Sequence, residues 1–370
     1  MEHSPTSSEH IPVTVLGATG MVGQRIIERL RNHPWFRIAS LCASEKSAGK
    51  PYAEATQWRL PSPLDPYIAR MQVQECIPTV EGAIALSGLD SSVAGPIERH
   101  FAESGFAVVS NARNHRMDPH VPLIIPEVNA DHLQLITRQQ FRSGCTVTNP
   151  NCSTTGLVMA LKPLHDSFGV TNVDVTTLQA ASGAGYPGVP SMDLIDNVVP
   201  FISGEEEKMA TEPRKILGTL EADGIRFADM QLSAQCNRVP VLDGHLACVK
   251  VGLRQRATRQ QVEDALRNFR PSPGSLSLPS SPEEPLVYLG NPAHPQPRLH
   301  RDLGSGMTVS VGRLQECDVL DYKFVVLSHN TIRGAAGAAV QNAELLVRSR
   351  LCGALQRYAV FDPPEQQKHL

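Results

Sequence analysis

The sequence predicts an α/β protein in two parts: a Rossmann-type, doubly wound parallel sheet, and an α+β domain with a mostly antiparallel sheet. Three observations predict this fold. Over the first 150 residues, short apolar segments alternate with helical stretches, which is typical of a parallel sheet. Beyond residue 150, the strand segments alternate apolar with polar residues, as in a sheet that is covered on one face. A length of 370 residues is sufficient for two domains.

The first half begins with a strand, a turn and a helix. Residues 12–16 form a short apolar segment, and Val22, Ile26 and Leu30 then recur at helical spacing. Further strands are expected at 36–42, 71–73, 83–86, 107–109 and 123–125, with a helix at 92–104.

The second half combines strands with a few long helices. A helix is expected to begin near Ser153, and Thr258 with Gln261 three residues later forms the capping box of another. Residues 271–301, rich in Pro and Ser, are expected to form loops around one short strand. The last long helix is expected over 333–350. Strands are expected at 173–177, 247–253, 308–311 and 322–327.

Composition excludes several classes of protein. A formal net charge of -3 gives no reason to expect a nucleic-acid partner. No apolar run approaches the length of a membrane span, and residues 1–10 lack the apolar core of a signal peptide, so no membrane partner is expected. The eight cysteines include no C-x-x-C pair, so no metal site is expected. Reduced thiols in a cytoplasmic protein are the simplest interpretation.

Three glycines follow the first predicted strand, at positions 17, 20 and 23. Their spacing is a variant of the dinucleotide-binding fingerprint G-x-G-x-x-G. Glycine lets the backbone turn tightly and approach a pyrophosphate, while the N-terminus of the next helix faces the negative charge. The alternative is a tight turn that binds no ligand. The placement between a strand and a helix favours the dinucleotide site.

The segment after the second predicted strand indicates which dinucleotide is bound. NAD sites usually carry an acidic residue there, whereas this chain has Ser44, Lys46 and Ser47. These groups suit the 2′-phosphate of NADP better than a bare ribose. Glu45 leaves NAD as the alternative, because a carboxylate binds a 2′-hydroxyl. The segment therefore favours NADP.

Cys152 has the position of a nucleophile. It follows an apolar strand segment, and apolar residues at helical spacing follow it. A helix N-terminus stabilises a thiolate through free N–H groups and the helix dipole. Such a thiolate attacks a carbonyl, and neighbouring N–H groups bind the oxyanion. A buried structural cysteine is the alternative, for which Cys145, inside the strand, is the better candidate.

His245 and Arg238 lie in one short segment that also contains a Pro and a Gly. His245 can take the thiol proton and return it later, and Arg238 can bind a carboxylate through two parallel hydrogen bonds. Arg116 and Lys208 are further cations, but Lys208 follows three glutamates, and that charge pattern alone predicts a solvated helix face. The glycine-rich segment 182–188 either borders a ligand or simply turns.

Seven segments, taken together and in this order, resemble the aspartate-semialdehyde dehydrogenase family, in particular its fungal-type branch. They are 17–23, 110–112, 149–156, 179–185, 204–208, 236–245 and 329–331. The resemblance runs from about residue 12 to the final helix. It implies the reduction of L-aspartyl 4-phosphate to L-aspartate 4-semialdehyde with NADPH, on the route to lysine, threonine, methionine and isoleucine.

The resemblance also implies a role for each site residue. Cys152 is the nucleophile, His245 is the acid/base, and Gln179 positions the acyl group. Arg238 and Glu205 bind the carboxylate and the amine of the substrate. The implied phosphate contacts are Arg116, Asn151 and Lys208. The implied cofactor contacts are Gly17, Thr19, Gly20, Met21, Val22, Gly23, Ser44, Lys46, Ser47, Ser182, Gly183 and Asn330.

By the same resemblance, residues 1–151 plus 330–370 form the NADP-binding domain, and residues 152–329 form the catalytic and dimerisation domain. A homodimer or homotetramer is implied. Three alternatives stay open: an N-acetyl-glutamyl-phosphate type of reductase, a duplicated copy with a shifted acyl substrate, and a non-catalytic NADP-binding protein. The acidic run before Lys208 argues against the first alternative, and the presence of Cys152 and His245 argues against the last.

Overall fold

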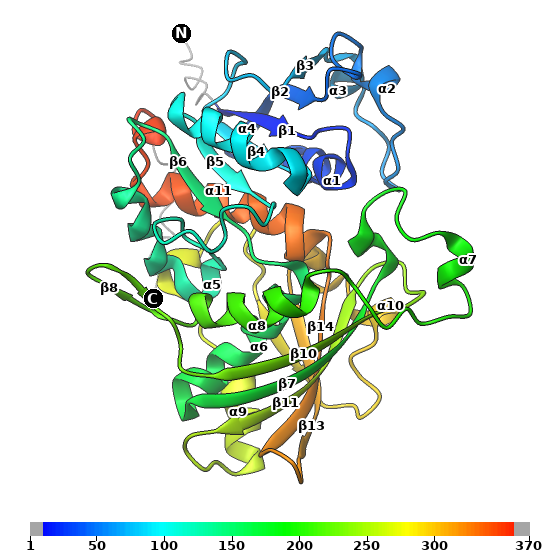
Figure 1. Cartoon of the computed structure of the whole chain (residues 1–370), viewed down its shortest axis with the longest axis vertical. Helices are drawn as coiled ribbons and strands as arrows, with labels where there is room; N and C mark the ends of the chain where they lie inside the picture. The colour runs from blue at the N-terminus through cyan, green and yellow to red at the C-terminus, as the bar shows by residue number, and fades with distance from the viewer. Residues whose placement is uncertain (1–9, 359–370) are drawn as a thin grey trace, which may run out of the picture.

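Two six-stranded sheets organise residues 10–358, which are the residues that the computed structural model describes. The sheets lie one above the other along the long axis of the molecule, and the chain passes from the first to the second near residue 150 (Figure 1). Residues 1–9 and 359–370, which complete the predicted NADP-binding domain, lie outside the described residues.

The first sheet is parallel throughout. Its strand order is β3-β2-β1-β4-β5-β6, with every neighbouring pair parallel, and this is the strand order of the Rossmann fold. The order reverses between β1 and β4, so ligands are expected outside the carboxyl ends of these strands. The strands are β1 (Ile11–Leu16), β2 (Phe36–Ala43), β3 (Val73–Glu75), β4 (Ile84–Ser87), β5 (Ala107–Ser110) and β6 (Cys145–Thr148).

Helices cover both faces of the first sheet, as predicted. On one face, α1 (Met21–Leu30) and α11 (Gly337–Ser349) share an apolar core with the strands. On the other face, α4 (Ser91–Glu103) packs through Phe101. Because α11 contacts α1, β4 and β5, the last long helix returns to the first sheet.

The second sheet is mixed and mostly antiparallel, as predicted. Its order is β10-β7-β11-β14-β13-β12. The three central pairs are antiparallel and the two outer pairs are parallel. The strands are β7 (Val170–Gln179), β10 (Gln231–Arg238), β11 (His245–Leu253), β12 (Leu286–Leu289), β13 (Val309–Glu316) and β14 (Tyr322–Ser328). The helices α6 (Cys152–Phe168), α8 (Glu205–Ile216) and α9 (Arg259–Arg267) pack against it, and α9 begins with the predicted capping box.

Short elements connect the larger ones. The α-helices are α2 (Tyr52–Ala55), α3 (Pro66–Arg70), α5 (Pro126–Asn129), α7 (Ser191–Leu194) and α10 (Pro297–His300), and the hairpin is β8 (Thr219–Glu221) with β9 (Gly224–Arg226). The 3-10 turns are η1 (Ala130–Arg138), η2 (Ala181–Ala184), η3 (Pro273–Ser275), η4 (Leu303–Gly306) and η6 (Gly353–Leu355), and a π-helical turn, η5 (Ile332–Ala336), precedes α11.

The strand predicted at 123–125 is wrong. Leu123 makes only an isolated bridge with Thr148, and α5 begins directly after Ile125, at a proline. The side chain of Asn129 bonds the backbone N–H of Ile125 and the carbonyl of Leu123. These backbone groups are therefore not available for a sheet ladder. The last helix also differs from its prediction, because its first turn is π-helical.

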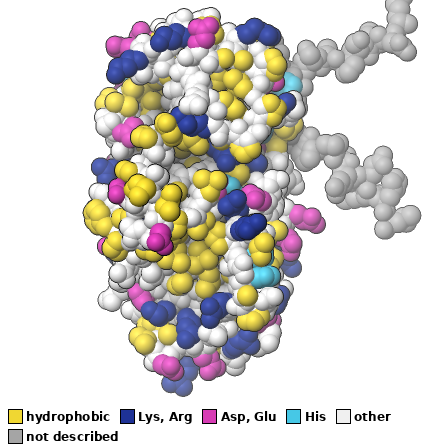
Figure 2. Space-filling model, turned by 90° about the vertical axis from the view of Figure 1, so that its right-hand side faces the viewer, with side chains coloured by type: hydrophobic (Ala, Val, Ile, Leu, Met, Phe, Trp, Pro, Cys, Tyr) yellow, Lys and Arg dark blue, Asp and Glu magenta, His cyan; other side chains and the backbone are white. Residues whose placement is uncertain are grey.

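Large apolar side chains are exposed around α7 and α10. Met192, Ile195, Phe201, Leu242 and Leu299 are all more than half exposed. Figure 2 views the molecule from this side and shows hydrophobic side chains gathered across its middle. Within residues 10–358, no helix combines the length and the apolarity that crossing a membrane requires.

Candidate active site

Cys152 is the first residue of α6, a few residues beyond the carboxyl end of β6. Asn151 caps this helix, because its side-chain oxygen accepts hydrogen bonds from the backbone N–H groups of Ser153 (3.0 Å) and Thr154 (3.3 Å). The prediction of a helix start here is confirmed. Cys145 is buried in β6, also as predicted.

His245, the first residue of β11, lies beside the cysteine. The Sγ atom of Cys152 is 3.2 Å from Nε2 of His245. The backbone N–H of Ala180 donates to Nδ1 of His245 at 3.0 Å. A neutral ring that accepts at Nδ1 carries its proton on Nε2, so this proton faces the sulfur.

Burial keeps this pair uncharged. Desolvation is the main cause that raises the pKa of Cys152 to about 12, and the negative charge of Glu205 adds to it, while nearby cations oppose both. Desolvation also lowers the pKa of His245 to about 3. Burial therefore disfavours the thiolate that is expected at this helix start, as long as no substrate is bound.

Glu205 is buried at the start of α8 and is the centre of a hydrogen-bond cluster. Asn151 donates to its two carboxylate oxygens at 3.0 and 2.9 Å, Gln179 at 3.2 Å and Lys208 at 2.7 Å. Burial opposes ionisation of Glu205, but the charge of Lys208 and these hydrogen bonds outweigh burial and lower its pKa. The charge pattern alone is thus misleading for Glu205, which is not on a solvated face.

Arg238 ends β10 and is only 4% exposed. Its Nη1 donates to the carbonyl of Ala180 at 2.8 Å, so the same residue holds Arg238 and His245. Burial lowers the pKa of Arg238, while the charges around it act in the opposite direction. Gly183 closes this corner: a Cβ there would lie 2.7 Å from Nη1 of Arg238 and 3.0 Å from Nε2 of His245.

Arg116, in the loop after β5, also reaches the cluster. Its Nη1 donates to Glu212 at 2.8 Å, and its Nη2 donates to the carbonyl of Asn111 at 2.7 Å. The other oxygen of Glu212 accepts the backbone N–H of Asn151 at 2.7 Å. All the residues predicted for catalysis and substrate binding are therefore joined by one network of contacts or lie beside it.

The glycine turn has the geometry that a pyrophosphate requires. Gly17 has φ +72°, and a Cβ there would lie 2.8 Å from the carbonyl oxygen of Gly88. A Cβ at Gly23 would lie 2.2 Å from the carbonyl oxygen of Gly17, so only glycine allows this close packing of helix on turn. The N-terminus of α1 has no side-chain cap. No side chain therefore satisfies its first N–H groups, as in anion-binding helix starts.

The segment predicted to bind the 2′-phosphate follows β2 at the same edge of the sheet. Ser44 and Lys46 are exposed and Ser47 is half-buried, in a turn closed by the Ser47 N–H and the Ser44 carbonyl at 2.8 Å. Since β2 neighbours β1 in parallel, this turn and the glycine turn lie at adjacent strand ends.

Contacts of Asn330 and Asp243 connect the loops beside His245 to the segment before α11 and to α1. Asn330, just after β14, accepts from the backbone N–H of Gly244 and donates to the hydroxyl of Ser182, both at 2.8 Å. Arg25 on α1 lies 4.0 Å from Asp243. The loops before His245 and around Gly183 therefore face the carboxyl edge of the first sheet.

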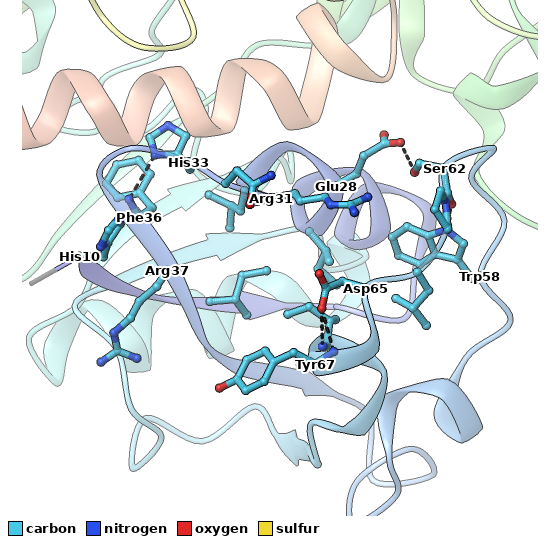
Figure 3. A pocket seen from close by; sticks show the side chains of 17 residues that line it. His10, Glu28, Arg31, His33, Phe36, Arg37, Trp58, Ser62, Asp65 and Tyr67 are labelled. Atoms are coloured by element: carbon cyan, nitrogen blue, oxygen red, sulfur yellow. Dashed lines mark hydrogen bonds between the residues drawn. The ribbon is translucent and has the colours of Figure 1, made fainter.

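A cavity of about 440 Å³ lies elsewhere, between the last turn of α1, the start of β2 and residues 58–68 (Figure 3). Phe36, Trp58 and Tyr67 are among its lining residues. It opens near the amino end of β2, whereas ligands of doubly wound sheets bind outside the carboxyl ends. This cavity is therefore separate from the candidate active site.

Sequence reasoning missed three contributors to the site. The backbone of Ala180 orients the histidine, and Gly334 lies against the cysteine, where a Cβ would be 2.7 Å from Cβ of Cys152. The third is Glu212. Only Glu212 has a signal in the sequence, because it follows Glu205 by two helical turns and so lies on the same face of the helix.

A nucleotide-binding sheet that faces a cysteine and a histidine in contact defines a class of protein: dehydrogenases that hold an acyl group on a cysteine. Residues 12–136 match the family model described as semialdehyde dehydrogenase, NAD binding domain, and residues 161–333 match semialdehyde dehydrogenase, dimerisation domain. The chain belongs to the aspartate-semialdehyde dehydrogenase family, as its relatives show.

The similarity to those relatives covers nearly the whole chain. The chain is 47% identical over 351 residues to the aspartate-semialdehyde dehydrogenase of Schizosaccharomyces pombe, and 46% identical over 343 residues to that of Archaeoglobus fulgidus. Each match covers 92% of this chain and 98% of the relative. The crystal structure of the Candida albicans enzyme with NADP has a TM-score of 0.85 at 44% identity, covering 91% of this chain and 98% of that one.

Proposed function

We propose that the chain reduces L-aspartyl 4-phosphate to L-aspartate 4-semialdehyde with NADPH, through a thioester on Cys152, in lysine, threonine, methionine and isoleucine biosynthesis. One observation carries the proposal: Sγ of Cys152 is 3.2 Å from Nε2 of His245, beside a nucleotide-binding sheet. Relatives with the name aspartate-semialdehyde dehydrogenase, which match over 92% of this chain, support the choice of substrate.

The chemistry follows from the cysteine and its neighbours. Cys152 attacks the acyl carbon and expels phosphate, which leaves the thioester. Gln179 positions the acyl group. The N–H groups of Ser153 and Thr154 already bond Asn151, so the backbone N–H of Cys152 is the donor left for the oxyanion. NADPH, when bound, supplies the hydride that reduces the thioester, and the hemithioacetal then releases the aldehyde.

His245 is the proposed acid/base. To take the thiol proton at Nε2, the ring must carry its second proton on Nδ1, where the Ala180 N–H now donates. The Ala180 contact therefore disfavours the tautomer in which His245 acts as a base, and a base role requires this contact to be lost. In the resting state it acts as a hydrogen-bond donor to the sulfur.

The substrate is held by the charged residues around Glu205. Arg238 binds its carboxylate and Glu205 its amine, while Arg116, Asn151 and Lys208 bind its phosphate. In the substrate-free chain, Lys208 and Glu205 pair with each other at 2.7 Å. Binding of L-aspartyl 4-phosphate would replace this ion pair with two others, because the substrate amine would pair with Glu205 and the substrate phosphate with Lys208.

NADP fits the residues at the carboxyl edge of the first sheet. The uncapped start of α1 lies directly against the glycine turn, with no room for a Cβ at Gly23, and this strand-turn-helix arrangement suits the pyrophosphate. The proposed pyrophosphate contacts are Gly17, Thr19, Gly20, Met21, Val22 and Gly23. The proposed contacts of the 2′-phosphate are Ser44, Lys46 and Ser47, and those near the nicotinamide are Ser182, Gly183 and Asn330.

We also propose the domain boundaries, the assembly and the compartment. The NADP-binding domain is 1–151 plus 330–370, and the catalytic and dimerisation domain is 152–329. The matched dimerisation domain and the exposed apolar side chains near α7 support a homodimer or homotetramer. Light scattering of the wild type and of Phe201→Glu tests this assembly, and a monomeric wild type contradicts it. The eight free thiols suit the cytoplasm.

The decisive assay uses purified protein with L-aspartate semialdehyde, inorganic phosphate and NADP. The expected result is an increase in NADPH absorbance that requires phosphate. N-acetyl-L-glutamate semialdehyde is the matched control substrate, and it should give a far lower rate. A folded protein that shows no phosphate-dependent signal with L-aspartate semialdehyde contradicts the proposed substrate.

A further inference from the structure

Glu212 bridges three segments of the active site. It projects from α8 with only 2% of its surface exposed. One carboxylate oxygen accepts from Nη1 of Arg116 at 2.8 Å, and the other accepts from the backbone N–H of Asn151 at 2.7 Å. A single buried carboxylate therefore joins α8 to the loop after β5 and to the residue that precedes Cys152.

We propose that Glu212 is a positioning residue that holds the phosphate-binding guanidinium of Arg116 in register with the nucleophile Cys152. This inference rests on the proposed function, in which Arg116 binds the phosphate of the substrate. Asn151 caps the helix that Cys152 begins. Fixing the Asn151 amide therefore fixes the cysteine relative to the cation, and both must act on one acyl phosphate.

The hydrogen bonds of Arg116 leave one of its nitrogens without a partner. Glu212 and the carbonyl of Asn111 each accept a hydrogen bond from one terminal nitrogen. Its Nε is buried and has no hydrogen-bond partner among the described residues. A buried donor without a partner is costly, and a phosphate oxygen would satisfy it with a charge-assisted hydrogen bond.

The position requires a carboxylate in particular. Both partners of Glu212 are donors, one a guanidinium and one a backbone N–H, so both oxygens must accept. Glutamine has the same size but offers one acceptor and one donor group, so one of the two contacts is lost. Aspartate keeps both acceptors but is shorter by one CH₂, so it should restore part of the function.

The first experiment measures steady-state rates of aldehyde oxidation, in which inorganic phosphate is a substrate. Glu212→Gln is expected to raise KM for phosphate by about tenfold, the loss of roughly one charge-assisted hydrogen bond. KM for NADP should be unchanged, and Glu212→Asp should recover part of the loss. Glu344→Gln is the matched control, because Glu344 is a buried carboxylate that bonds His33 and Ser280, outside the site. It should leave KM for phosphate unchanged.

The second experiment needs neither turnover nor cofactor. Phosphate should slow the alkylation of Cys152 by iodoacetamide in the wild type, and Glu212→Gln should need about ten times more phosphate for the same protection. If the wild type is protected but does not turn over aspartate semialdehyde, the proposed function fails and the role of Glu212 stands. If phosphate does not protect the wild type, or protects a folded Glu212→Gln equally well, the inference is overturned. If the glutamine variant does not fold, Glu212→Asp is used instead: it should need more phosphate than the wild type, by less than about tenfold, and equal protection overturns the inference.

Discussion

The catalytic cluster and the turn after β2 are built in opposite ways. Around Cys152, His245 and Glu205, polar side chains are hydrogen-bonded at 2.7–3.2 Å without any ligand. Ser44 and Lys46 are exposed, and neither side chain bonds another residue of the described range 10–358. The cluster is therefore organised before the substrate arrives, whereas the turn presents groups that only a ligand engages.

This difference predicts different sizes of mutational effect. A preorganised cluster stabilises the transition state through geometry that is already fixed, so the loss of one member affects all the others. An exposed cation contributes only about 0–1 kcal/mol to an ion pair, because water screens it. Substitutions in the cluster should change rates by orders of magnitude, and substitutions in the turn only by small factors.

The largest effect is expected for Cys152→Ala. It should lower kcat by about 10⁴-fold or more, because no thioester can form without the sulfur. The affinity for NADPH, measured by fluorescence titration, should be nearly unchanged. Cys248→Ala is the matched control, since Cys248 is an exposed thiol on β11, and it should keep its activity. Substantial turnover by Cys152→Ala would remove this residue from the nucleophile's role.

The uncharged state of the pair predicts a steep pH dependence of thiol reactivity. Burial raises the pKa of Cys152 to about 12 and lowers the pKa of His245 to about 3. Between these values the thiol is protonated, so its thiolate fraction increases about tenfold per pH unit. Alkylation by iodoacetamide in the substrate-free protein should therefore accelerate about 10³-fold from about pH 6 to about pH 9. A plateau near neutral pH would instead reveal a preformed thiolate–imidazolium pair.

Arg238→Leu is expected to have an intermediate effect. The side chain fits the same space in part but loses every donor, so KM for aspartate semialdehyde should rise by about 10²-fold. KM for NADP should rise far less, because the proposed pyrophosphate and 2′-phosphate contacts are on the other sheet and only Gly183, near the nicotinamide, lies beside Arg238. Arg226→Leu, at an exposed position in the β8–β9 hairpin, is the matched control. A normal KM for the aldehyde in Arg238→Leu would exclude the carboxylate role.

Local sequence patterns were sufficient to predict an element where its start carries a recognisable signal. The capping box at Thr258 and the apolar residues at helical spacing after Cys152 both mark helices that the structure contains. The apolar segment 123–125 has no such signal. Whether it joins a sheet depends on Asn129, whose side chain occupies its backbone groups, and apolar periodicity does not report that competition.

The site was predictable in its chemistry but not in its electrostatics. Cys152 could be selected from local sequence. His245 is one of thirteen histidines, for which a surface or structural role is the default, so its selection and that of Glu205 depend on the family resemblance. The role of Glu212 was not predicted, because its partner Arg116 is 96 residues away in the sequence. The direction of the pKa shift at Cys152 could not be predicted for the same reason. The burial of this thiol depends on β11, α8 and the loop at Ala180, which are distant in the sequence, whereas the start of the helix can be recognised locally.

The smallest effect is expected for Lys46→Ala. An exposed ion pair contributes up to about 1 kcal/mol, so KM for NADPH should rise by only about threefold to fivefold. KM for NADH should not change, because NADH lacks the 2′-phosphate. Glu45→Gln is the matched control on the same turn. Removing the negative charge of Glu45 should not weaken the binding of NADPH. An equal rise of KM for NADPH and for NADH would mean that Lys46 does not contact the 2′-phosphate. A loss of about 10²-fold for NADPH alone would mean that the turn is as preorganised as the catalytic cluster, since an exposed, flexible lysine cannot supply that much binding energy.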